Sequence, residues 1–403
     1  MKGDLGKKMG GNQAYASAVD PEAGPENIAF QDLMRILIAV DKYKGGASSS
    51  QIAKAIEKGL KEALKEAVFD ICPLADGGEG TTEALTNAGQ GNLREIATEN
   101  ALGWPISAQI GLLDQGRTAV IEMSAASGLA MIPSDKRNPM KSSTLGTGIL
   151  MCKAVAAGSS KLLMGIGGSA TNDGGLGVAI ALGYRFKGRD GLFQPSLETL
   201  LEAVEILPPE KPWTAEVVVA CDVDNPLLGP KGATRIYGPQ KGVRDFGWFE
   251  ARMEKLADLA EALAGRRLRD VPGAGAAGGL GFGLMAFANA RLESGFELVA
   301  SCTGLAERVR RADLVITGEG RLDEQTLNGK GPAGVARMAR AAGRRVVAVA
   351  GSAQDSAAVR AAFDLTVSVK PPDMPLEEAM RRTEELVESA VAAQASAIVG
   401  AAG

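Results

Sequence analysis

Short apolar segments without polar alternation constrain the fold of this chain most. They are five or six residues long, rich in Val, Ile or Leu, and end near Gly, Asp or Pro. Runs of this kind are typical of strands buried on both faces of a parallel sheet. The predicted strands are Arg35–Val40, Phe69–Leu74, Lys161–Gly165, Val217–Cys221, Asp313–Thr317, Val346–Ala350 and Leu365–Val369.

Helical patterns follow several of these strands. They are predicted over Ser49–Ala63, Thr81–Asn87, Ala333–Ala342 and Leu376–Ala395. Pro332 stands where the third of these helices would begin, which is a position that proline favours. Strands that alternate with helices predict an α/β fold.

Residues 92–122 do not follow this alternation of strands and helices. Three strands in a meander are predicted there, LREIATE, PISAQIGLL and TAVIEM, with turn signals LGWP and DQG between them. We therefore predict a doubly wound, parallel-sheet domain built from residues 34–91 and 290–398, with a second α/β domain, residues 92–289, inserted into it. Residues 1–33 are rich in Gly and charge and lack an apolar core, so we expect a disordered tail. A cleft between two domains is a favoured place for a small-molecule site.

The absence of histidine limits the chemistry. Not one of the 403 residues is a histidine. This excludes serine–histidine and cysteine–histidine catalysis and the two-histidine zinc helices of metalloproteases. Acid–base work falls to Asp, Glu, Lys, Tyr or Cys, and a bound metal is expected to be a hard, oxygen-bound ion such as Mg²⁺.

Charge, cysteine spacing and hydropathy exclude further classes. A net charge of −4 and a pI near 5.4 argue against a nucleic-acid partner. The four cysteines form no CxxC pair and are expected to be core thiols in a reducing cytoplasm. The charge-free run Val271–Ala290 contains six glycines, a proline and an asparagine. Its hydrophobicity is poor for a membrane span, so we predict a Gly-rich loop that leads into a buried helix.

Two segments of similar sequence give the strongest indication of an anion-binding site. Residues 75–85 read ADGGEGTTEAL, and residues 172–182 read NDGGLGVAIAL. Paired glycines expose amide groups near a helix N-terminus, which suits a phosphate or a carboxylate. The alternative is a tight turn in which the aspartate, Asp76 or Asp173, caps the helix. The second segment is preceded by GIGGSAT, residues 165–171. The residues of these three stretches expected to bind an anion are Gly77, Gly78, Gly167, Gly168, Ser169, Thr171 and Asn172.

A charged cluster follows the predicted strand Asp313–Thr317. Glu319, Arg321 and Asp323 stand there, and Lys330 comes shortly after. Ligands of open α/β sheets bind outside the carboxyl ends of the strands. Arg and Lys suit a phosphate or carboxylate, and Glu and Asp suit Mg²⁺, whereas the alternative is a solvated loop.

The segment ACDVDN has two aspartates, Asp222 and Asp224, at a spacing that can hold a divalent ion. Lys231 and Lys241 follow in Gly-Pro turns that would present them rigidly. The alternative is a strand end followed by two surface turns. We expect Asp222, with Glu319 and Asp323, to hold the metal.

The first βα turn is a usual ligand site in a doubly wound sheet. Asp41 and Lys44 lie in this turn, where Lys44 could meet an anion or be a plain exposed lysine. Arg137 and Asn138 form a second polar loop, for which a capped turn is the alternative.

A GxGxxG pattern runs from Gly273 to Gly278. It is weak as a dinucleotide fingerprint, because no clear strand precedes it. Its glycines Gly275 and Gly278 could still present amides to an anion.

Taken together, these segments resemble the class I glycerate kinase family. The shared motifs are DKYKGGASS, PLADGGEGT, IEMSAASGL, RNPMKSSTLGTG, GIGGSATNDGG, ACDVDNPLLGPKGA, YGPQKG, PGAGAAGGLGFG and DLVITGEGRLDEQTLNGKGP. They occur in the family's order from about Met34 to about residue 390. The chain departs from the family at Lys42 and Tyr43 in the opening motif, and at Ala130 and Asn328, where histidines are common.

The resemblance implies ATP-dependent phosphorylation of D-glycerate with Mg²⁺, with 2-phosphoglycerate favoured over 3-phosphoglycerate as the product. It also implies a flavodoxin-like domain with an inserted α/β domain. Asp173, Asp76 and Lys44 are the expected catalytic residues. Asp173 is preferred as the base, because Ser169, Thr171 and Asn172 beside it supply donors that a substrate would need.

Two other functions stay open at this point. One is an NAD-dependent dehydrogenase that uses the GxGxxG segment, and the other is a non-catalytic, anion-binding regulator. No nucleic-acid or membrane partner is expected, and the location is expected to be cytoplasmic. The sequence leaves the oligomeric state open, with a homodimer as one option.

Overall fold

Two main sheets organise the chain in the computed structural model, which describes residues 33–400 except for residues 73, 75, 76, 79, 325 and 327–330. The first sheet has five parallel strands in the order β16-β14-β12-β1-β2. Their bounds are Arg35–Val40 for β1, Val68–Ile71 for β2, Leu314–Gly318 for β12, Arg345–Ala350 for β14 and Leu365–Ser368 for β16. This is the flavodoxin-like strand order, so the predicted doubly wound sheet is confirmed.

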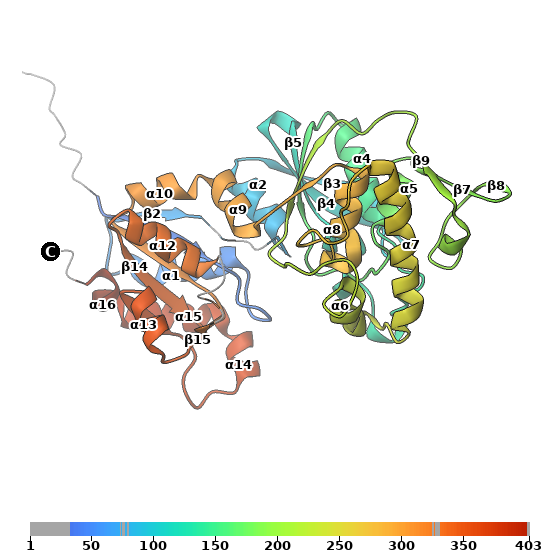
Figure 1. Cartoon of the computed structure of the whole chain (residues 1–403). Helices are drawn as coiled ribbons and strands as arrows, with labels where there is room; N and C mark the ends of the chain where they lie inside the picture. The colour runs from blue at the N-terminus through green and yellow to red at the C-terminus, as the bar shows by residue number, and fades with distance from the viewer. Residues whose placement is uncertain are drawn as a thin grey trace, which may run out of the picture. The chain divides into compact units, whose positions relative to one another are not determined.

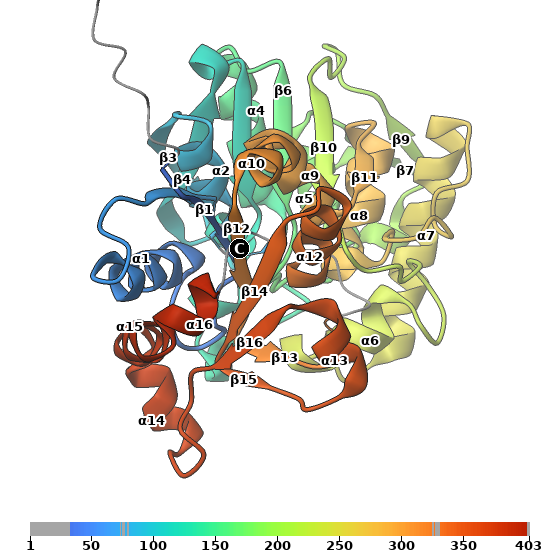
Figure 2. The same ribbon diagram turned by 90° about the vertical axis from the view of Figure 1, so that its left-hand side faces the viewer.

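Both faces of the five-stranded sheet are buried, as the unalternated strand sequences predict. In β1, Ile36 and Ile38 point into one apolar core, and Leu37 and Ala39 point into another. Helices of both chain ends build the first core, and helices from the second half build the other (Figure 2). The first group is α1 (Ser49–Lys61), α15 (Thr383–Ala393) and α16 (Ala395–Val399); the second is α10 (Leu305–Arg311), α12 (Pro332–Ala341) and α13 (Ala357–Ala362).

Local signals explain where two of these helices begin. Ser48 caps α1 in a capping box, because its hydroxyl accepts from the Gln51 amide while the Gln51 side chain reaches the Ser48 amide. Pro332 occupies the first turn of α12, as predicted.

The predicted single helix over Leu376–Ala395 is wrong. The structure has α14 (Leu376–Arg381), then α15 and α16, with non-helical backbone at Arg382 and Gln394. At the first break, the Thr383 hydroxyl donates to the carbonyls of Ala379 and Met380 and so competes with the helical pattern.

The second sheet has six strands in the order β11-β10-β6-β5-β4-β3. Their bounds are Asn92–Glu99 for β3, Pro105–Leu113 for β4, Thr118–Glu122 for β5, Lys161–Gly165 for β6, Glu216–Ala220 for β10 and Arg291–Glu293 for β11. The pairs β3–β4 and β4–β5 are antiparallel, which confirms the predicted meander. The pairs from β5 to β11 are parallel.

Helices cover both faces of the six-stranded sheet (Figure 1). On one face lie α2 (Thr81–Ala88) and α9 (Gly295–Thr303); on the other lie α4 (Leu145–Ala156), α5 (Leu176–Ala181), α7 (Phe246–Ala264) and α8 (Ala276–Phe287). The helix predicted within Val271–Ala290 is α8, which is almost entirely buried. Because β11 and α2 lie outside residues 92–289, the six-stranded sheet and its helices draw on residues from both sides of the predicted insert.

Smaller elements complete the described chain. Three short antiparallel strands that the sequence analysis missed form a sheet of their own: β7 (Arg185–Gly188), β8 (Gly191–Phe193) and β9 (Glu205–Leu207). The remaining described α-helices and strands are α3 (Ser124–Ser127), α6 (Ala233–Lys241) and the pair β13 (Arg321–Leu322) and β15 (Ser352–Ala353). Among the described helices, none is long and apolar enough to cross a membrane.

Candidate active site

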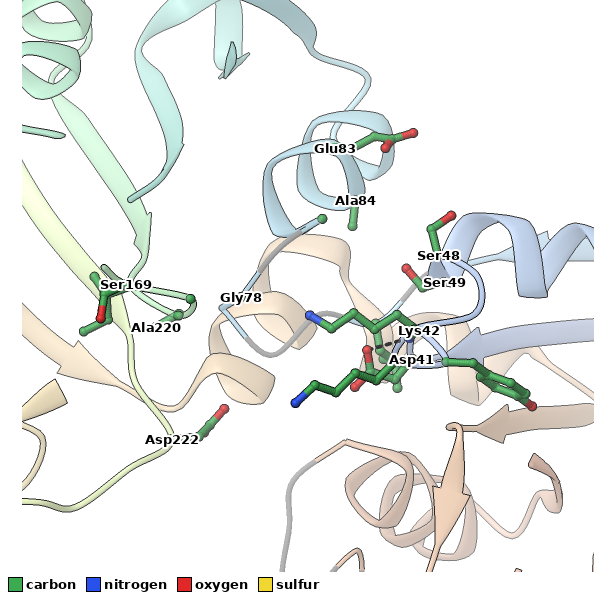
Figure 3. Close-up of a pocket in the computed structure, with 18 of the residues that line it drawn as sticks. Asp41, Lys42, Ser48, Ser49, Gly78, Glu83, Ala84, Ser169, Ala220 and Asp222 are labelled. Atoms are coloured by element: carbon green, nitrogen blue, oxygen red, sulfur yellow. Dashed lines mark hydrogen bonds between the residues drawn. The ribbon is translucent and has the colours of Figure 1, made fainter. Parts of the chain in front are cut away.

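A cavity of about 860 Å³ lies at the carboxyl ends of strands from both sheets. It is lined by residues 41–50 after β1, residues 166–169 after β6 and residues 220–223 at the end of β10 (Figure 3). Its volume falls within the range of about 300–1,000 Å³ that is usual for small-molecule sites. The position agrees with the rule that ligands of open α/β sheets bind where parallel strands end.

The loop after β1 brings cations and a helix N-terminus to the cavity. Lys42 and the exposed Lys44 line it, together with the serines that begin α1. Tyr43 between the two lysines is buried, and its hydroxyl donates to the Val349 carbonyl at 2.8 Å. Burial, helped by the nearby Glu319 charge, raises the pKa of Tyr43, so the phenol stays neutral and anchors the loop. The partial positive charge at the start of α1 suits an anion.

One carboxylate from each sheet faces the cavity. Asp41 follows β1, and its Oδ1 accepts from the Lys42 amide at 2.7 Å. Asp222 follows β10, and its Oδ1 accepts from the Ser294 hydroxyl at 2.9 Å and from the Gly295 amide at 3.1 Å. These two bonds tie Asp222 to the start of α9 and fix where its carboxylate stands.

Glycines let the loops after β2 and β6 pack backbone against backbone. A Cβ on Gly165 would lie 2.4 Å from the Gly77 carbonyl oxygen, and one on Gly167 would lie 2.9 Å from the Gly78 Cα. Gly77 has a φ of +80°, which favours glycine. Of the predicted glycines in these loops, Gly78, Gly167 and Gly168 line the cavity, and Gly77 packs on Ala220 beside it.

Ser169 lines the cavity, and Lys241 lies beneath it. Lys241 ends α6 and is 1% exposed. Its Nζ donates to the Ser169 hydroxyl oxygen at 2.7 Å and to the Thr171 carbonyl at 2.6 Å. Burial lowers the pKa of Lys241 to about 7, against the opposing effect of the Asp173 charge. The lysine that was predicted to bind an anion is therefore buried behind Ser169 and is not among the residues that line the cavity.

Asp173 is enclosed rather than open to the cavity. It is 2% exposed, and its Oδ2 accepts from the Thr144 amide and hydroxyl and from the Gly177 amide, while its Oδ1 accepts from the Gly175 amide. Burial raises the pKa of Asp173, and these four hydrogen bonds oppose that rise. This placement favours the cap over the base. Asp76, the other candidate base, lies outside the described residues.

The remaining polar candidates near these loops do not line the cavity. Asn172 is buried, and its side-chain amide donates to the Thr234 hydroxyl at 3.0 Å, close to the buried Thr171. Arg137 donates to the Gln240 carbonyl at 3.3 Å. The Asn138 side chain accepts from the Met140 amide at 3.2 Å and closes its own turn.

The GxGxxG segment serves close packing at the start of α8. A Cβ on Gly275 would lie 2.1 Å from the Pro226 carbonyl oxygen, and one on Gly278 would lie 2.0 Å from the Thr171 carbonyl oxygen. The segment follows α7 and a loop, so the strand that a dinucleotide fingerprint needs is missing there. Within α8, Ala276 and Ala277 are the residues that reach the cavity.

The charged cluster after β12 is separate from the described cavity lining. The Arg321 side chain is 76% exposed and pairs with Asp323 at 3.3 Å. Asp323 also accepts from the Thr326 amide. In the part of the chain that the structure describes, no three Cys, Asp or Glu side chains gather as a metal site, so Asp222, Glu319 and Asp323 do not form the predicted set. Lys330 lies outside the described residues.

Several residues in or beside the site were not predicted from the sequence. Glu122 ends β5 and is 7% exposed; it accepts from the Thr82 amide at 2.7 Å and from the Ser124 hydroxyl at 3.2 Å. Burial raises its pKa against those bonds. Its position at the end of the predicted strand TAVIEM was the available signal. Glu122 is not among the residues that line the cavity; the lining residues that were missed are Lys42, Tyr43, Ser48, Ser49, Ser50, Glu83, Asn87, Tyr237 and Gln240.

Comparison with known proteins gives a consistent result. The model of the glycerate kinase family matches residues 36–399. Glycerate kinase of Bacillus subtilis (strain 168) is 44% identical over 363 residues, which cover 88% of this chain and 95% of the relative. Glycerate 2-kinase of Escherichia coli (strain K12) is 43% identical over 357 residues, which cover 86% and 93%.

A solved structure agrees with these relatives. The crystal structure of "putative glycerate kinase 2" from Salmonella typhimurium LT2 superposes with a TM-score of 0.81 at 38% sequence identity, covering 91% of this chain and 98% of that one. Family model, sequence relatives and fold thus agree over nearly all of the described residues. The chain belongs to the glycerate kinase family.

Proposed function

We propose that this chain transfers the γ-phosphoryl group of ATP to the 2-hydroxyl group of D-glycerate, with Mg²⁺, and releases 2-phosphoglycerate and ADP. Family membership supports the reaction class. The relative named glycerate 2-kinase supports the choice of hydroxyl.

The observation that carries the proposal is the cavity where both sheets end. It joins the lysines and helix N-terminus after β1 to the glycine loop after β6 and to a carboxylate from each sheet. Phosphoryl transfer requires little covalent chemistry from the protein and depends on positioning and on neutralising charge. These residue types supply both requirements without a histidine.

The residues present fit a nucleotide phosphate chain. Lys42 and Lys44 offer cations, and Ser48 and Ser49 bring the positive end of α1 to the cavity. A Lys ammonium near phosphoryl oxygens neutralises charge that grows in the transition state. We assign this role to Lys44 first, since it is the exposed lysine that lines the cavity.

The residues also fit Mg²⁺. This ion is usually held in kinases by one or two carboxylates together with substrate phosphates, so a preformed cage of three acidic side chains is not required. Asp222 would hold the ion, with Asp41 as the second carboxylate. When bound, Mg²⁺ would neutralise phosphoryl charge and orient the transferred group.

The transfer itself is a substitution at phosphorus. The hydroxyl oxygen of glycerate forms a bond to the γ-phosphorus while the bond from that phosphorus to the bridging oxygen of ADP breaks. The hydroxyl proton passes to a carboxylate or to water, and a loose transition state needs little help in removing it. Because Asp41 is assigned to the metal, Asp76 stays the candidate carboxylate for this role, and Asp173 acts as a cap in this scheme.

Coupled assays test the proposal. ADP release by the purified protein is expected to require both D-glycerate and Mg²⁺, and enolase is expected to convert the product directly to phosphoenolpyruvate, as it does 2-phosphoglycerate. ADP release at the same rate without D-glycerate would overturn the proposal. A product that enolase accepts only after phosphoglycerate mutase is added would move the reaction to the 3-hydroxyl.

Neither alternative function is favoured. An NAD-dependent dehydrogenase needs a strand–turn–helix site, which the GxGxxG segment does not form. An anion-binding regulator would not need the carboxylates at the cavity, whereas a phosphotransferase uses them. The cytoplasmic location belongs to the proposal as well and is supported by the free thiols of Cys72, Cys152, Cys221 and Cys302.

A further inference from the structure

In its protonated form, Lys241 is a buried cation without a carboxylate partner at bonding distance. Its Nζ contacts two neutral oxygens, those of the Ser169 hydroxyl and the Thr171 carbonyl. In the described part of the chain, no ion pair within 4.0 Å includes this lysine, and the nearby Asp173 oxygens are taken by N–H and O–H donors. An ammonium buried with neutral partners alone is costly, so its presence calls for a compensating gain.

The direction of the Lys241–Ser169 hydrogen bond follows from the chemistry of the two groups. Below its pKa of about 7, and whenever a bound anion favours the charged form, Lys241 is an ammonium with three donors and no acceptor, whereas a hydroxyl has one donor and two acceptor lone pairs. The Ser169 oxygen therefore accepts from Lys241, and its own hydrogen must point elsewhere. No acceptor for that hydrogen is found among the residues that the structure describes.

The backbone around Ser169 leaves the cavity as the place for that hydrogen. Ser169 pairs with Gly128 in an isolated bridge, the Leu129 amide donates to the Gly168 carbonyl at 2.8 Å, and the Ala170 amide donates to the Ser127 carbonyl at 2.9 Å. These bonds hold the loop from one side, and Lys241 holds the side chain from beneath. Ser169 lines the cavity on the remaining side (Figure 3).

The turn after α6 explains why Lys241 reaches this position. Gly242 follows with a φ of +98°, so the chain reverses immediately after the helix and Lys241 turns inward. The neighbouring Gln240 and Tyr237 of the same helix line the cavity. A cation in the last turn of a helix is also favoured by the helix dipole.

We propose that Lys241 is a positioning residue that commits the Ser169 hydroxyl to donate its hydrogen to an anionic oxygen of the ligand. Lys241 acts on the ligand through Ser169. A carboxylate or phosphoryl oxygen bound above Ser169 also compensates the buried charge of Lys241. A ligand group that is itself a hydrogen-bond donor is disfavoured at this point. The inference rests on the proposed function for the identity of the two ligands that could supply the oxygen, D-glycerate through its carboxylate and the nucleotide through a phosphate.

Equilibrium binding tests the inference without turnover. Calorimetry with D-glycerate, MgADP and inorganic phosphate is run on the wild type, on Ser169→Ala, on Lys241→Met and on the double variant. A hydrogen bond to a charged group is worth roughly tenfold to a hundredfold in affinity, so each single change is expected to weaken one ligand by about tenfold or more. Because Lys241 acts through Ser169, the double variant is expected to lose no more than the larger single loss.

The ligand affected identifies the oxygen. A loss confined to D-glycerate assigns the carboxylate, and a loss of MgADP or phosphate assigns the phosphoryl oxygen; each supports the inference. Ser159→Ala and Lys153→Met are matched controls, since Ser159 is a buried serine bonded to the Gly116 carbonyl and Lys153 is a lysine bonded to the Ala97 carbonyl, both outside the cavity lining. Both controls are expected to bind as the wild type does.

Three results would overturn the inference. The first is binding by Ser169→Ala within twofold of the wild type for every probe, which decides the matter even if Lys241→Met does not fold. The second is a double variant whose loss equals the product of the two single losses, and the third is a wild type that binds none of the probes. If only glycerate-dependent ADP release fails, the proposed function is overturned. The inference about Ser169 is still tested in that case, by the binding of MgADP and phosphate.

Discussion

Two loop groups border the same cavity but are built in opposite ways. The first, called here the β1 edge, is residues 41–50; the second, called the β6–β10 edge, is residues 166–173 and 220–223. The β1 edge presents lysines toward solvent, with Lys44 exposed. The β6–β10 edge is mostly buried between residues 166 and 173, where Asp173 is 2% exposed, and Lys241 of α6, which contacts this edge, is 1% exposed.

The difference separates two ways of treating a charged ligand. Exposed cations attract it over a distance, and salt screens that attraction. Buried, hydrogen-bonded groups are held in place before the ligand arrives and are therefore suited to fixing its geometry. Changes on the β1 edge should alter binding in a salt-dependent way, and changes on the β6–β10 edge should alter catalysis or stability with little dependence on salt.

The largest effect is expected at Asp222. Asp222→Asn keeps the size of the side chain but removes the charge that would hold Mg²⁺, so kcat is expected to fall on the order of a hundredfold or more. The measurement is the initial rate of ADP release across a range of Mg²⁺ concentrations. Asp224→Asn is the control, because Asp224 is exposed and is not among the residues that line the cavity. Equal rates for the two variants would remove Asp222 from the metal site.

Asp173→Asn is expected to act on stability. The amide would turn one hydrogen-bond acceptor into a donor within a set of four donors, leaving at least one of them unpaired at a cost of about 1–3 kcal/mol in the free energy of unfolding. Thermal melting is expected to show a lower Tm, with kcat of the folded fraction close to that of the wild type. A normal Tm together with a hundredfold loss of kcat would instead make Asp173 the base.

Lys44→Ala tests whether the exposed β1 edge attracts the ligand through solvated charge. We expect the KM for ATP to rise by about tenfold at low ionic strength and the difference from the wild type to shrink as KCl is added. Lys58→Ala is the control, an exposed lysine of α1 that pairs with Glu388. A loss for Lys44→Ala that does not change with salt would contradict the solvated, long-range role.

The pH dependence of stability tests the buried side. Burial lowers the pKa of Lys241 from its ordinary value of 10.5 to about 7, while the unfolded chain keeps the ordinary value. Between about pH 7 and pH 10 the unfolded chain therefore binds more protons, and this lysine makes the free energy of unfolding rise with pH, by up to about 1.4 kcal/mol per pH unit. The charges near it are Asp173, which opposes the shift, and Arg137, which donates to the Gln240 carbonyl.

Chemical denaturation at several pH values measures this slope. The wild type is expected to gain stability relative to Lys241→Met from pH 7 to pH 9 and to show no difference in slope well below pH 7. Parallel curves for the two proteins across pH 7–9 would show that Lys241 keeps an ordinary pKa in the folded state.

The smallest effect is expected at Arg321. Its exposed side chain pairs with Asp323 outside the described cavity lining, and a surface ion pair of this kind contributes about 0–1 kcal/mol. Arg321→Ala is expected to keep kcat/KM within about twofold of the wild type, since such pairs rarely matter for more than local order. A tenfold loss of kcat/KM would show that Arg321 acts in the active site.

Buried strands were predictable from sequence because their pattern is local. β1 and β6 have the predicted bounds, and the remaining strands of the five-stranded sheet differ from prediction only at their ends. The short strands β7, β8 and β9 were missed because three- and four-residue strands carry too little pattern. The helix breaks at Arg382 and Gln394 were missed because they depend on contacts that the spacing of apolar residues in the sequence does not reveal.

The site was harder to predict, since a motif does not say whether its side chain faces a cavity or a core. The Asp-Gly-Gly turn that begins at Asp173 has the residues of a ligand loop, yet its aspartate is buried and accepts from the Gly177 amide in the first turn of α5. Lys241 follows a Gly-Pro segment expected at the surface, yet it is 1% exposed. The loop after β1 was easier, because its place at the end of a central strand follows from strand order alone.

A crystal structure with D-glycerate, Mg²⁺ and a non-hydrolysable ATP analogue tests most directly the claim that these two edges form one active site. Both ligands are expected to lie in the cavity, with phosphate oxygens near Lys44 and the start of α1, the metal on Asp222, and an anionic oxygen within hydrogen-bond distance of the Ser169 hydroxyl. Ligands bound elsewhere, for example beside Arg321 and away from both edges, would contradict it.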